Sequence, residues 1–251
     1  MCRCEKIFNF LKETQFQMNR TQIYINGEYM LNNPGWGGED AGWKTEIINK
    51  LLKKNGILFN NAVEVGCGSG EILLELSKKY PGATYFTGYD ISPQAIEIAN
   101  RICNERIRFY NENFLETGMQ NHDLLLLIDV IEHVEDYYGF LNVLKQKAAK
   151  FVFHIPLDLS CRTLLKPHVL LQQRDSVGHI QYFTREMVFW MLKDTGYKVI
   201  DWVYTKPLLD TAPQASVKNK IKKLLRNFSF RVNKDLSASL WGGYSLMILA
   251  E

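Results

Sequence analysis

Apolar and polar positions follow two different periods along this chain, and together they predict strands that alternate with helices. Short apolar runs at 62–65 and 123–128 are typical of buried parallel strands. Between them, residues 71–79 carry apolar side chains at helical spacing. The same patterns predict further strands at 84–89, 107–110, 151–155, 197–204 and 244–250, and further helices at 45–54, 94–103, 137–149 and 184–196.

This alternation predicts an α/β fold in which helices cover both faces of a mostly parallel sheet. The last two predicted strands follow each other without a clear packed helix between them. A chain of 251 residues can bury a full core, so we expect one α/β domain with additions. No apolar run approaches the roughly 20 residues that a membrane span needs.

Composition narrows the class of protein only slightly. A hydrophobic content of 46% and a charged content of 23% are ordinary for a globular protein, and a net charge of +3 does not by itself imply nucleic acid. The five cysteines are odd in number and scattered, which argues against a disulfide framework and for a reducing, cytoplasmic location. They are Cys2, Cys4, Cys67, Cys103 and Cys161.

The most informative segment is residues 63–70, which read V-E-V-G-C-G-S-G between a predicted strand and a predicted helix. Glycines in such a turn let a ligand approach bare backbone, as in nucleotide-binding corners. The dinucleotide fingerprint G-x-G-x-x-G does not fit the spacing. Glu64 would also oppose a pyrophosphate, whereas it suits the ammonium group of a sulfonium cofactor. The residues that we expect to contact the cofactor here are Glu64, Gly66, Cys67, Gly68 and Gly70.

This segment resembles motif I of class I S-adenosylmethionine-dependent methyltransferases. Residues 128–136, I-D-V-I-E-H-V-E-D, resemble the (D/E)-x-(I/L)-E-H-(V/L) signature of small-molecule methyltransferases such as the quinone-precursor O-methyltransferases. The resemblance covers about 60–205 and the last strand, and it points to the broad methyltransferase type 11/12/23 group. It implies a Rossmann-like, mostly parallel seven-stranded sheet whose last strand is antiparallel. It also implies S-adenosylmethionine as cofactor and S-adenosylhomocysteine as product.

Two further cofactor contacts are expected at the ends of the second and third strands. Asp90 would accept hydrogen bonds from the ribose hydroxyls, with Ile91 beside the adenine. Asn113 stands where the family often has Asp against the adenine amino group, and Phe114 is its hydrophobic neighbour. The alternatives are that Asp90 only starts a turn and that Asn113 lies in an exposed polar loop.

The fourth strand leads into the signature, and the resemblance places Asp129 and Val130 near the methionine part of the cofactor. An acceptor oxygen or nitrogen must lose a proton, and imidazole suits that role. The histidines considered are His133, His154, His168 and His179, of which His154 is better explained as a core histidine. The resemblance implies that His133 lies near the transferring methyl, and residues 178–184, G-H-I-Q-Y-F-T, resemble a segment before the late helix of related enzymes, so His133 and His179 are the catalytic candidates. The alternative for Glu132 and His133 is that they cap and orient the following loop, and for His179 that it is a structural cap.

We expect no metal site. Asp129, Glu132 and His133 echo an E-x-x-E-H cluster that binds a divalent metal in some RNA 3′-end methyltransferases. The E-H signature is, however, widespread in metal-free relatives.

The chain is expected to divide into an N-terminal helical cap, 1–55, and a methyltransferase domain, 56–251, with substrate-side insertions near 157–180 and 206–238. Trp36 and Trp43 in the cap are candidates for covering the cofactor or the acceptor, or for core packing. Residues 218–234 contain seven basic residues and no acid. The favoured interpretation of 218–234 is a surface helix docked by its apolar side; peripheral contact with an anionic membrane is the alternative.

The function expected is methyl transfer from S-adenosylmethionine to an O or N of a small molecule, such as a sugar or lipid-linked precursor. The chain has no (D/N)-P-P-(Y/F) tetrapeptide, which argues against N-methylation of nucleobases, and nucleic acid is not the expected partner. The alternatives are an RNA or protein methyltransferase, a non-catalytic cofactor-binding module and a dinucleotide oxidoreductase.

Overall fold

A computed structural model describes residues 22–117, 121–207 and 217–251. Its centre is a seven-stranded sheet with the strand order β3-β2-β1-β4-β5-β7-β6. β7 runs antiparallel to both of its neighbours, and the other paired strands are parallel, as predicted. The strands are β1 Asn61–Val65, β2 Tyr85–Tyr89, β3 Ile107–Tyr110, β4 His122–Ile128, β5 Ala148–Leu157, β6 Val199–Thr205 and β7 Tyr244–Ala250.

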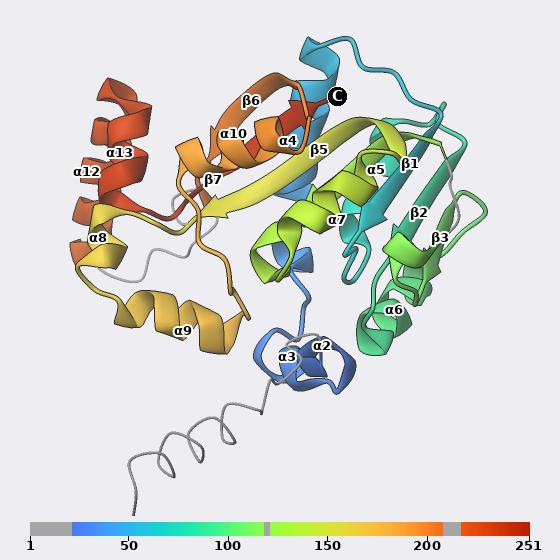
Figure 1. Cartoon of the computed structure of the whole chain (residues 1–251), viewed down its shortest axis with the longest axis horizontal. Coiled ribbons are helices and arrows are strands. Elements are labelled where there is room, and N and C mark those ends of the chain that lie inside the picture. The colour runs from blue at the N-terminus through green and yellow to red at the C-terminus, as the bar shows by residue number, and fades with distance from the viewer. Residues whose placement is uncertain (1–21, 118–120, 208–216) are drawn as a thin grey trace, which may run out of the picture.

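Helices cover both faces of this sheet (Figure 1). α4 (Ala41–Lys54), α5 (Glu71–Lys79) and α6 (Pro93–Ala99) share one apolar core with one face of the strands. α7 (Tyr137–Leu144) and α10 (Arg185–Asp194) share a second core with the other face. Side chains of β4 alternate between the two cores, which explains why this central strand is continuously apolar.

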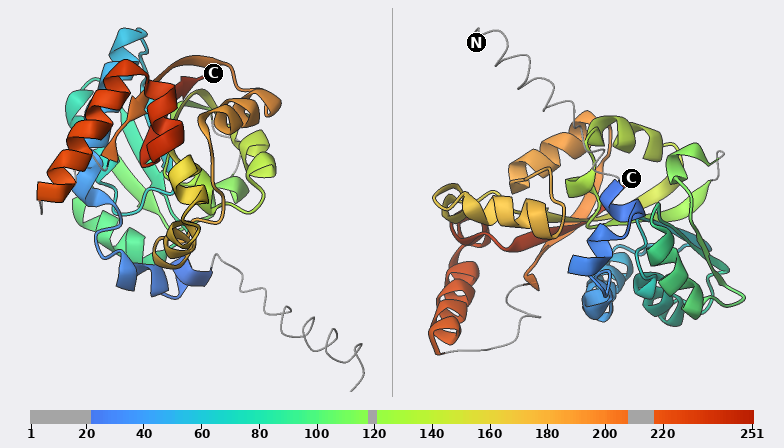
Figure 2. Two further views of the ribbon diagram at one scale, coloured as in Figure 1. Left: turned by 90° about the vertical axis from the view of Figure 1, so that its left-hand side faces the viewer. Right: turned by 90° about the horizontal axis from the view of Figure 1, so that it is seen from below.

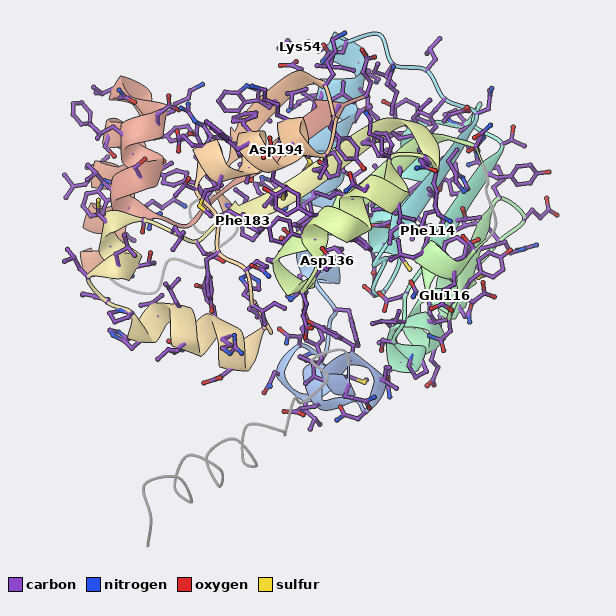
Figure 3. The ribbon with its side chains drawn as sticks, in the orientation of Figure 1. Lys54, Phe114, Glu116, Asp136, Phe183 and Asp194 are labelled. Atoms are coloured by element: carbon purple, nitrogen blue, oxygen red, sulfur yellow. The ribbon has the colours of Figure 1, made fainter. Side chains whose placement is uncertain are left out.

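Side-chain caps fix the first turns of three helices. The Ser92 hydroxyl accepts a hydrogen bond from the Ala95 amide, with Pro93 as the first helical residue. The Thr184 hydroxyl caps α10 in the same way. Asp136, at the start of α7, accepts from the Gly139 amide (Figure 3). Local chemistry therefore sets where these helices begin.

Three groups of short elements lie outside the sheet (Figure 2). They surround the edge of the sheet at which the parallel strands end. The first group is α2 Gln22–Ile25, α3 Glu28–Asn32 and the 3-10 turn η1 Gly38–Asp40; the second is α8 Cys161–Leu164 and α9 His168–Ser176; the third is α12 Val217–Val232 and α13 Lys234–Trp241. No helix in the described part of the chain is long and apolar enough to cross a membrane.

Two sequence-based expectations about the ends of strands and helices are wrong. The fifth strand does not stop before Pro156 but continues to Leu157, because β4 has ended there and position 156 pairs only with β7. α7 ends at Leu144, and Ala148 already belongs to β5. Between β6 and β7 lie α12 and α13, which pack on each other beyond the sheet, in agreement with the expectation that no helix packs across the sheet between these strands.

The sequence favoured a surface helix that docks on the domain by its apolar side. In the structure, the apolar side of α12 does not dock in this way. Arg226 and Phe230 face inward instead: the Arg226 guanidinium donates to the Gly242 carbonyl, and the Phe230 ring stacks on Tyr244 at 5.1 Å. Leu224 and Phe228 are consequently left exposed.

Candidate active site

A cavity of about 830 Å³ lies at the carboxyl ends of β1, β2 and β4, where open α/β sheets bind ligands. Nearly all of the predicted site residues line it, although they come from distant parts of the sequence. They are Glu64, Gly66, Cys67, Gly68, Asp90, Ile91, Asn113, Phe114, Asp129, Val130, His133 and His179. Gly70 does not line the cavity; it precedes α5 and packs against the Phe109 ring.

The glycine turn joins the ends of β1 and β2. The amides of Gly66 and Cys67 both donate to the Tyr89 carbonyl, at 2.8 and 3.1 Å. Gly66 has a φ of 73°, and a Cβ at this position would lie 2.6 Å from Cγ2 of Val130. A side chain here would therefore be both strained and in collision with the loop after β4.

Asp90 shapes the same turn from the end of β2. Its Oδ2 accepts from the Gly68 amide at 2.9 Å, and its Oδ1 accepts from the Ser92 amide at 2.8 Å. Burial raises the pKa of this carboxyl, although the backbone hydrogen bonds oppose the shift. Each carboxylate oxygen has a second lone pair, so Asp90 retains acceptors for a ligand in the cavity.

Asn113 and Phe114 form part of the adjoining rim. The Asn113 side chain caps a short turn: its oxygen accepts from the Leu115 amide at 3.1 Å, and its nitrogen donates to Glu116 at 2.8 Å. Phe114 is buried beside Tyr89, with ring centroids 4.9 Å apart (Figure 3). The amide oxygen that we expected to face adenine thus already serves a local cap.

Asp129 occupies the centre of the site, and Lys44 from α4 reaches it. The Lys44 ammonium lies 2.7 Å from Asp129 and 2.9 Å from Asp40. On the other side, Nδ1 of His154 lies 2.6 Å from Asp129, and its Nε2 lies 2.8 Å from the Thr205 hydroxyl. Burial alone would raise the pKa of Asp129, but His154 and Lys44 outweigh it and hold the pKa well below its usual range.

The backbone of Asp129 is also unusual. Its φ of 53° lies in the left-handed region, which non-glycine residues rarely adopt. Such conformations cluster at functional sites, where surrounding contacts hold them in place. The two partners of the Asp129 carboxylate supply those contacts.

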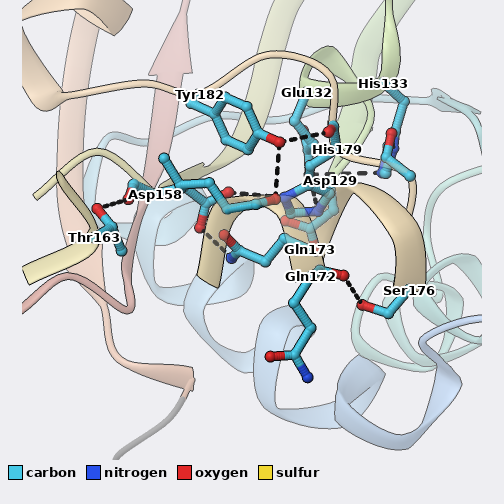
Figure 4. A network of polar contacts seen from close by, with 12 residues as sticks. Asp129, Glu132, His133, Asp158, Thr163, Gln172, Gln173, Ser176, His179 and Tyr182 are labelled. Carbon is cyan, nitrogen blue, oxygen red and sulfur yellow. Dashed lines mark hydrogen bonds and ion pairs between the residues drawn. The ribbon is translucent and has the colours of Figure 1, made fainter. Parts of the chain in front are cut away.

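A second polar cluster contains Glu132, His133, Asp158 and His179 (Figure 4). Nδ1 of His179 lies 2.7 Å from Asp158, and Nδ1 of His133 lies 3.1 Å from the Gly178 carbonyl oxygen. Glu132 is fully buried, and neither of its carboxylate oxygens has a hydrogen-bond partner in the described structure. Burial and the nearby Asp129 charge raise the pKa of Glu132 well above its usual range. Burial and His179 lower the pKa of His133 to about 4.

The wall of the cavity is strongly acidic. Among the described residues that line it, Lys44 is the only lysine or arginine. Burial and the Glu132 and Asp129 carboxylates raise the pKa of Tyr29 to about 12. The carboxylic acids of the wall are Asp40, Glu64, Glu71, Asp90, Glu112, Asp129, Glu132, Glu135 and Asp158. This arrangement suits a ligand with positive charge.

A family model described as a methyltransferase domain matches residues 41–201, more than half of the chain. The chain belongs to this family of methyltransferase domains. The expectation of a class I S-adenosylmethionine-dependent methyltransferase is therefore confirmed at the level of family and fold.

Solved methyltransferases share the fold at low sequence identity. A Haloferax volcanii methyltransferase in complex with the activator Trm112 has a TM-score of 0.62 at 15% identity, covering 90% of this chain and 95% of that one. The magnesium protoporphyrin IX methyltransferase of Synechocystis, with bound S-adenosylhomocysteine, has a TM-score of 0.56 at 16% identity, covering 83% and 82%.

The curated relatives match shorter segments. The release factor glutamine methyltransferase of Flavobacterium psychrophilum is 29% identical over 125 residues, which is 47% of this chain and 42% of the relative. The chain spans less than half the length of the curated relatives that it matches.

Sequence analysis missed several residues that line the methyltransferase cavity. Lys44 is marked only by its place after Trp43, and Asp158 only by its place in the insertion near 157–180. No sequence pattern marked Tyr24 and Tyr29 as site residues, because they precede the motifs in a segment without clear periodicity. Trp36 lines the cavity, as one interpretation of the cap had it, whereas Trp43 does not.

We predict that Asp129→Asn lowers the free energy of unfolding by at least about 2 kcal/mol, because it leaves buried Lys44 with one carboxylate fewer. Asparagine tolerates the left-handed backbone, so the loss of stability reports the removal of the negative charge. Urea denaturation would measure it. The control is Glu97→Gln, which removes an exposed carboxylate 3.9 Å from Arg101 and should change stability by less than about 0.5 kcal/mol. A loss in Asp129→Asn no larger than in this control would contradict the role of the pair.

Proposed function

We propose that this methyltransferase binds S-adenosylmethionine in the cavity and moves its methyl group to an oxygen or nitrogen of a small molecule. The observation that carries the proposal is the acidic wall behind the glycine turn. Among the described residues, nine carboxylic acids and a single lysine line this wall. The cofactor has a sulfonium and an ammonium against one carboxylate, so its net charge is positive. The wall and the cofactor are therefore complementary.

Individual residues fit the parts of this cofactor. Glu64 is buried, and its Oε2 has no partner among the described residues, so an ammonium group would satisfy it. The Lys44 ammonium would donate to the methionine carboxylate in addition to its two aspartate partners. Asp90 offers acceptors to the ribose, and Ile91 offers an exposed apolar side chain to the adenine. When bound, the cofactor supplies the electrophilic methyl group, and the protein supplies alignment.

The acidic wall disfavours the alternative ligands. A dinucleotide would bring an anionic pyrophosphate to a wall with one lysine, and nucleic acid would bring a row of phosphates. A small acceptor agrees better with a cavity of about 830 Å³ that the N-terminal elements and the α8–α9 insertion help to line. We propose that His133, His179 and Asp158 lie on the acceptor side, because they come from the loop after β4 and from this insertion.

We predict that Asp90→Asn weakens binding of S-adenosylhomocysteine at least tenfold, because hydrogen bonds to a charged acceptor contribute about 1.5–3 kcal/mol. Isothermal titration calorimetry would measure the affinity, and circular dichroism would confirm the fold. Glu97→Gln, on the outer side of α6, removes one carboxylate outside the cavity wall and should leave the affinity unchanged. An Asp90→Asn protein that binds as tightly as the parent would refute the ribose role.

We further propose that α12 contacts an anionic lipid surface, which would suit a lipid-linked acceptor. Leu224, Phe228 and Val232 are 69%, 67% and 71% exposed and fall four residues apart, so they share one side of the helix. Lys220 and Arg231 are exposed on the same helix. An apolar side flanked by basic residues is typical of helices that lie in a membrane interface.

Vesicle sedimentation tests this contact. We predict that the protein sediments with vesicles that contain phosphatidylserine but not with pure phosphatidylcholine, and that added salt weakens binding. The double variant Leu224→Ser/Phe228→Ser should lose most of the bound fraction. Leu58→Ser, which alters a 90% exposed leucine before β1, should not. Binding that is equal on both vesicle types, or unchanged in the double variant, would refute the proposal.

A further inference from the structure

Three side chains with metal-binding atoms converge on one point of the cavity wall. Glu132, His133 and His179 each offer an atom, and these atoms lie within 4.8 Å of one another. Glu132 and His133 come from the short turn η4 (Ile131–His133), whereas His179 follows α9. The two segments are held together by the Glu132 carbonyl, which accepts from the amides of Ile180 and Gln181 at 2.9 and 3.0 Å.

The hydrogen bonds of the two histidines decide which ring nitrogens face Glu132. Nδ1 of His133 lies 3.1 Å from the Gly178 carbonyl oxygen and 2.9 Å from the Tyr24 hydroxyl. The carbonyl can only accept, so the tautomer that satisfies it has the hydrogen on Nδ1, and the hydroxyl then accepts from the same nitrogen. Nδ1 of His179 likewise donates to Asp158 at 2.7 Å. The Nε2 atoms therefore present lone pairs. They lie 4.0 Å (His133) and 3.9 Å (His179) from the same Glu132 oxygen.

These distances do not correspond to hydrogen bonds, whose heavy atoms lie about 2.7–3.2 Å apart. Two lone pairs and a carboxylate oxygen that face one another form a donor set for a metal cation. Donors about 2.1 Å from a tetrahedral ion are about 3.4 Å apart, so small side-chain shifts would bring all three within bonding distance. A second, independent observation also points to a ligand. Glu132 is fully buried, and neither of its carboxylate oxygens has a hydrogen-bond partner in the described structure, which is unfavourable without a ligand.

We propose that Glu132, His133 and His179 bind a divalent first-row transition metal ion, for which zinc is the best match. A set of two imidazoles and one carboxylate suits zinc, iron, cobalt and nickel better than magnesium or calcium. This proposal revises the sequence-based expectation of no metal. It does not depend on the methyl acceptor, because the three ligands belong to the protein.

The surroundings have the form of a supporting shell for metal ligands. Asp158 orients His179 from the side opposite the cluster, and Gln173 in turn donates to the other Asp158 oxygen at 2.7 Å. Carboxylates that hold ligating histidines in this way commonly tune metal affinity. The three ligands also line the cavity, so the ion would have coordination positions open to an oxygen of the acceptor.

The test is metal binding by the full chain after chelation and dialysis. Titration with Zn²⁺ against a chromophoric chelator counts the sites, and titration with Co²⁺ reports nitrogen ligands through its visible absorption. We expect one tight ion per chain. His133→Gln and His179→Gln should each weaken binding at least tenfold. Asp158→Asn should weaken metal binding by about 10–100-fold, as substitutions of residues that orient metal-bound histidines do. His168→Gln, an exposed histidine outside the cluster, should bind like the parent.

Each alternative result overturns the proposal. Absence of a tight ion would do so, and so would tight binding that survives the His133 and His179 substitutions, since the ion would then sit at cysteines or elsewhere. Calorimetry with S-adenosylhomocysteine on the same variants shows that the cavity is intact. It also separates failure of the metal site from failure of the cofactor assignment, because Glu64 and Asp90 are unchanged in every variant.

Discussion

The contact between Lys44 and Asp129 is the constraint on which the rest of the site depends. It joins α4, from the start of the domain, to the loop after the central strand β4 at 2.7 Å. Through His154 and Thr205 the same carboxylate is tied to β5 and β6. A residue with a left-handed backbone is thereby held in place, and the loop that carries Val130, Glu132 and His133 leaves the sheet from this fixed point.

The charge of the cavity wall favours ligands with positive charge. Among the described residues of the wall, one lysine stands against nine carboxylic acids, so the wall is acidic. Two buried carboxyl groups, Glu64 and Glu132, have oxygens without partners in the described structure. These two groups lie at the ends of β1 and β4, and each fits a different positive group. We propose the ammonium of S-adenosylmethionine as the partner of Glu64, and a divalent cation between two histidines as the partner of Glu132. One physical principle, that buried charges require opposite charges, thus supports both proposals.

Much of this site could be predicted from sequence because parallel strands bring their carboxyl ends to one edge. The glycine turn, Asp90 and Asp129 each follow a predicted strand, and the structure gathers them around one cavity. Lys44 and Asp158 could not be assigned, because their partners Asp129 and His179 lie far away in the chain and no local period links them. The exposed side of α12 was also misjudged: helical spacing shows that a helix is amphipathic, but not which side meets the domain.

Isothermal titration of the purified chain with S-adenosylmethionine, S-adenosylhomocysteine and NAD tests the central claim most directly. An acidic cavity behind a glycine turn should bind one molecule of S-adenosylmethionine or S-adenosylhomocysteine per chain and show no measurable affinity for NAD. Tight binding of NAD without binding of either adenosyl cofactor would contradict the account.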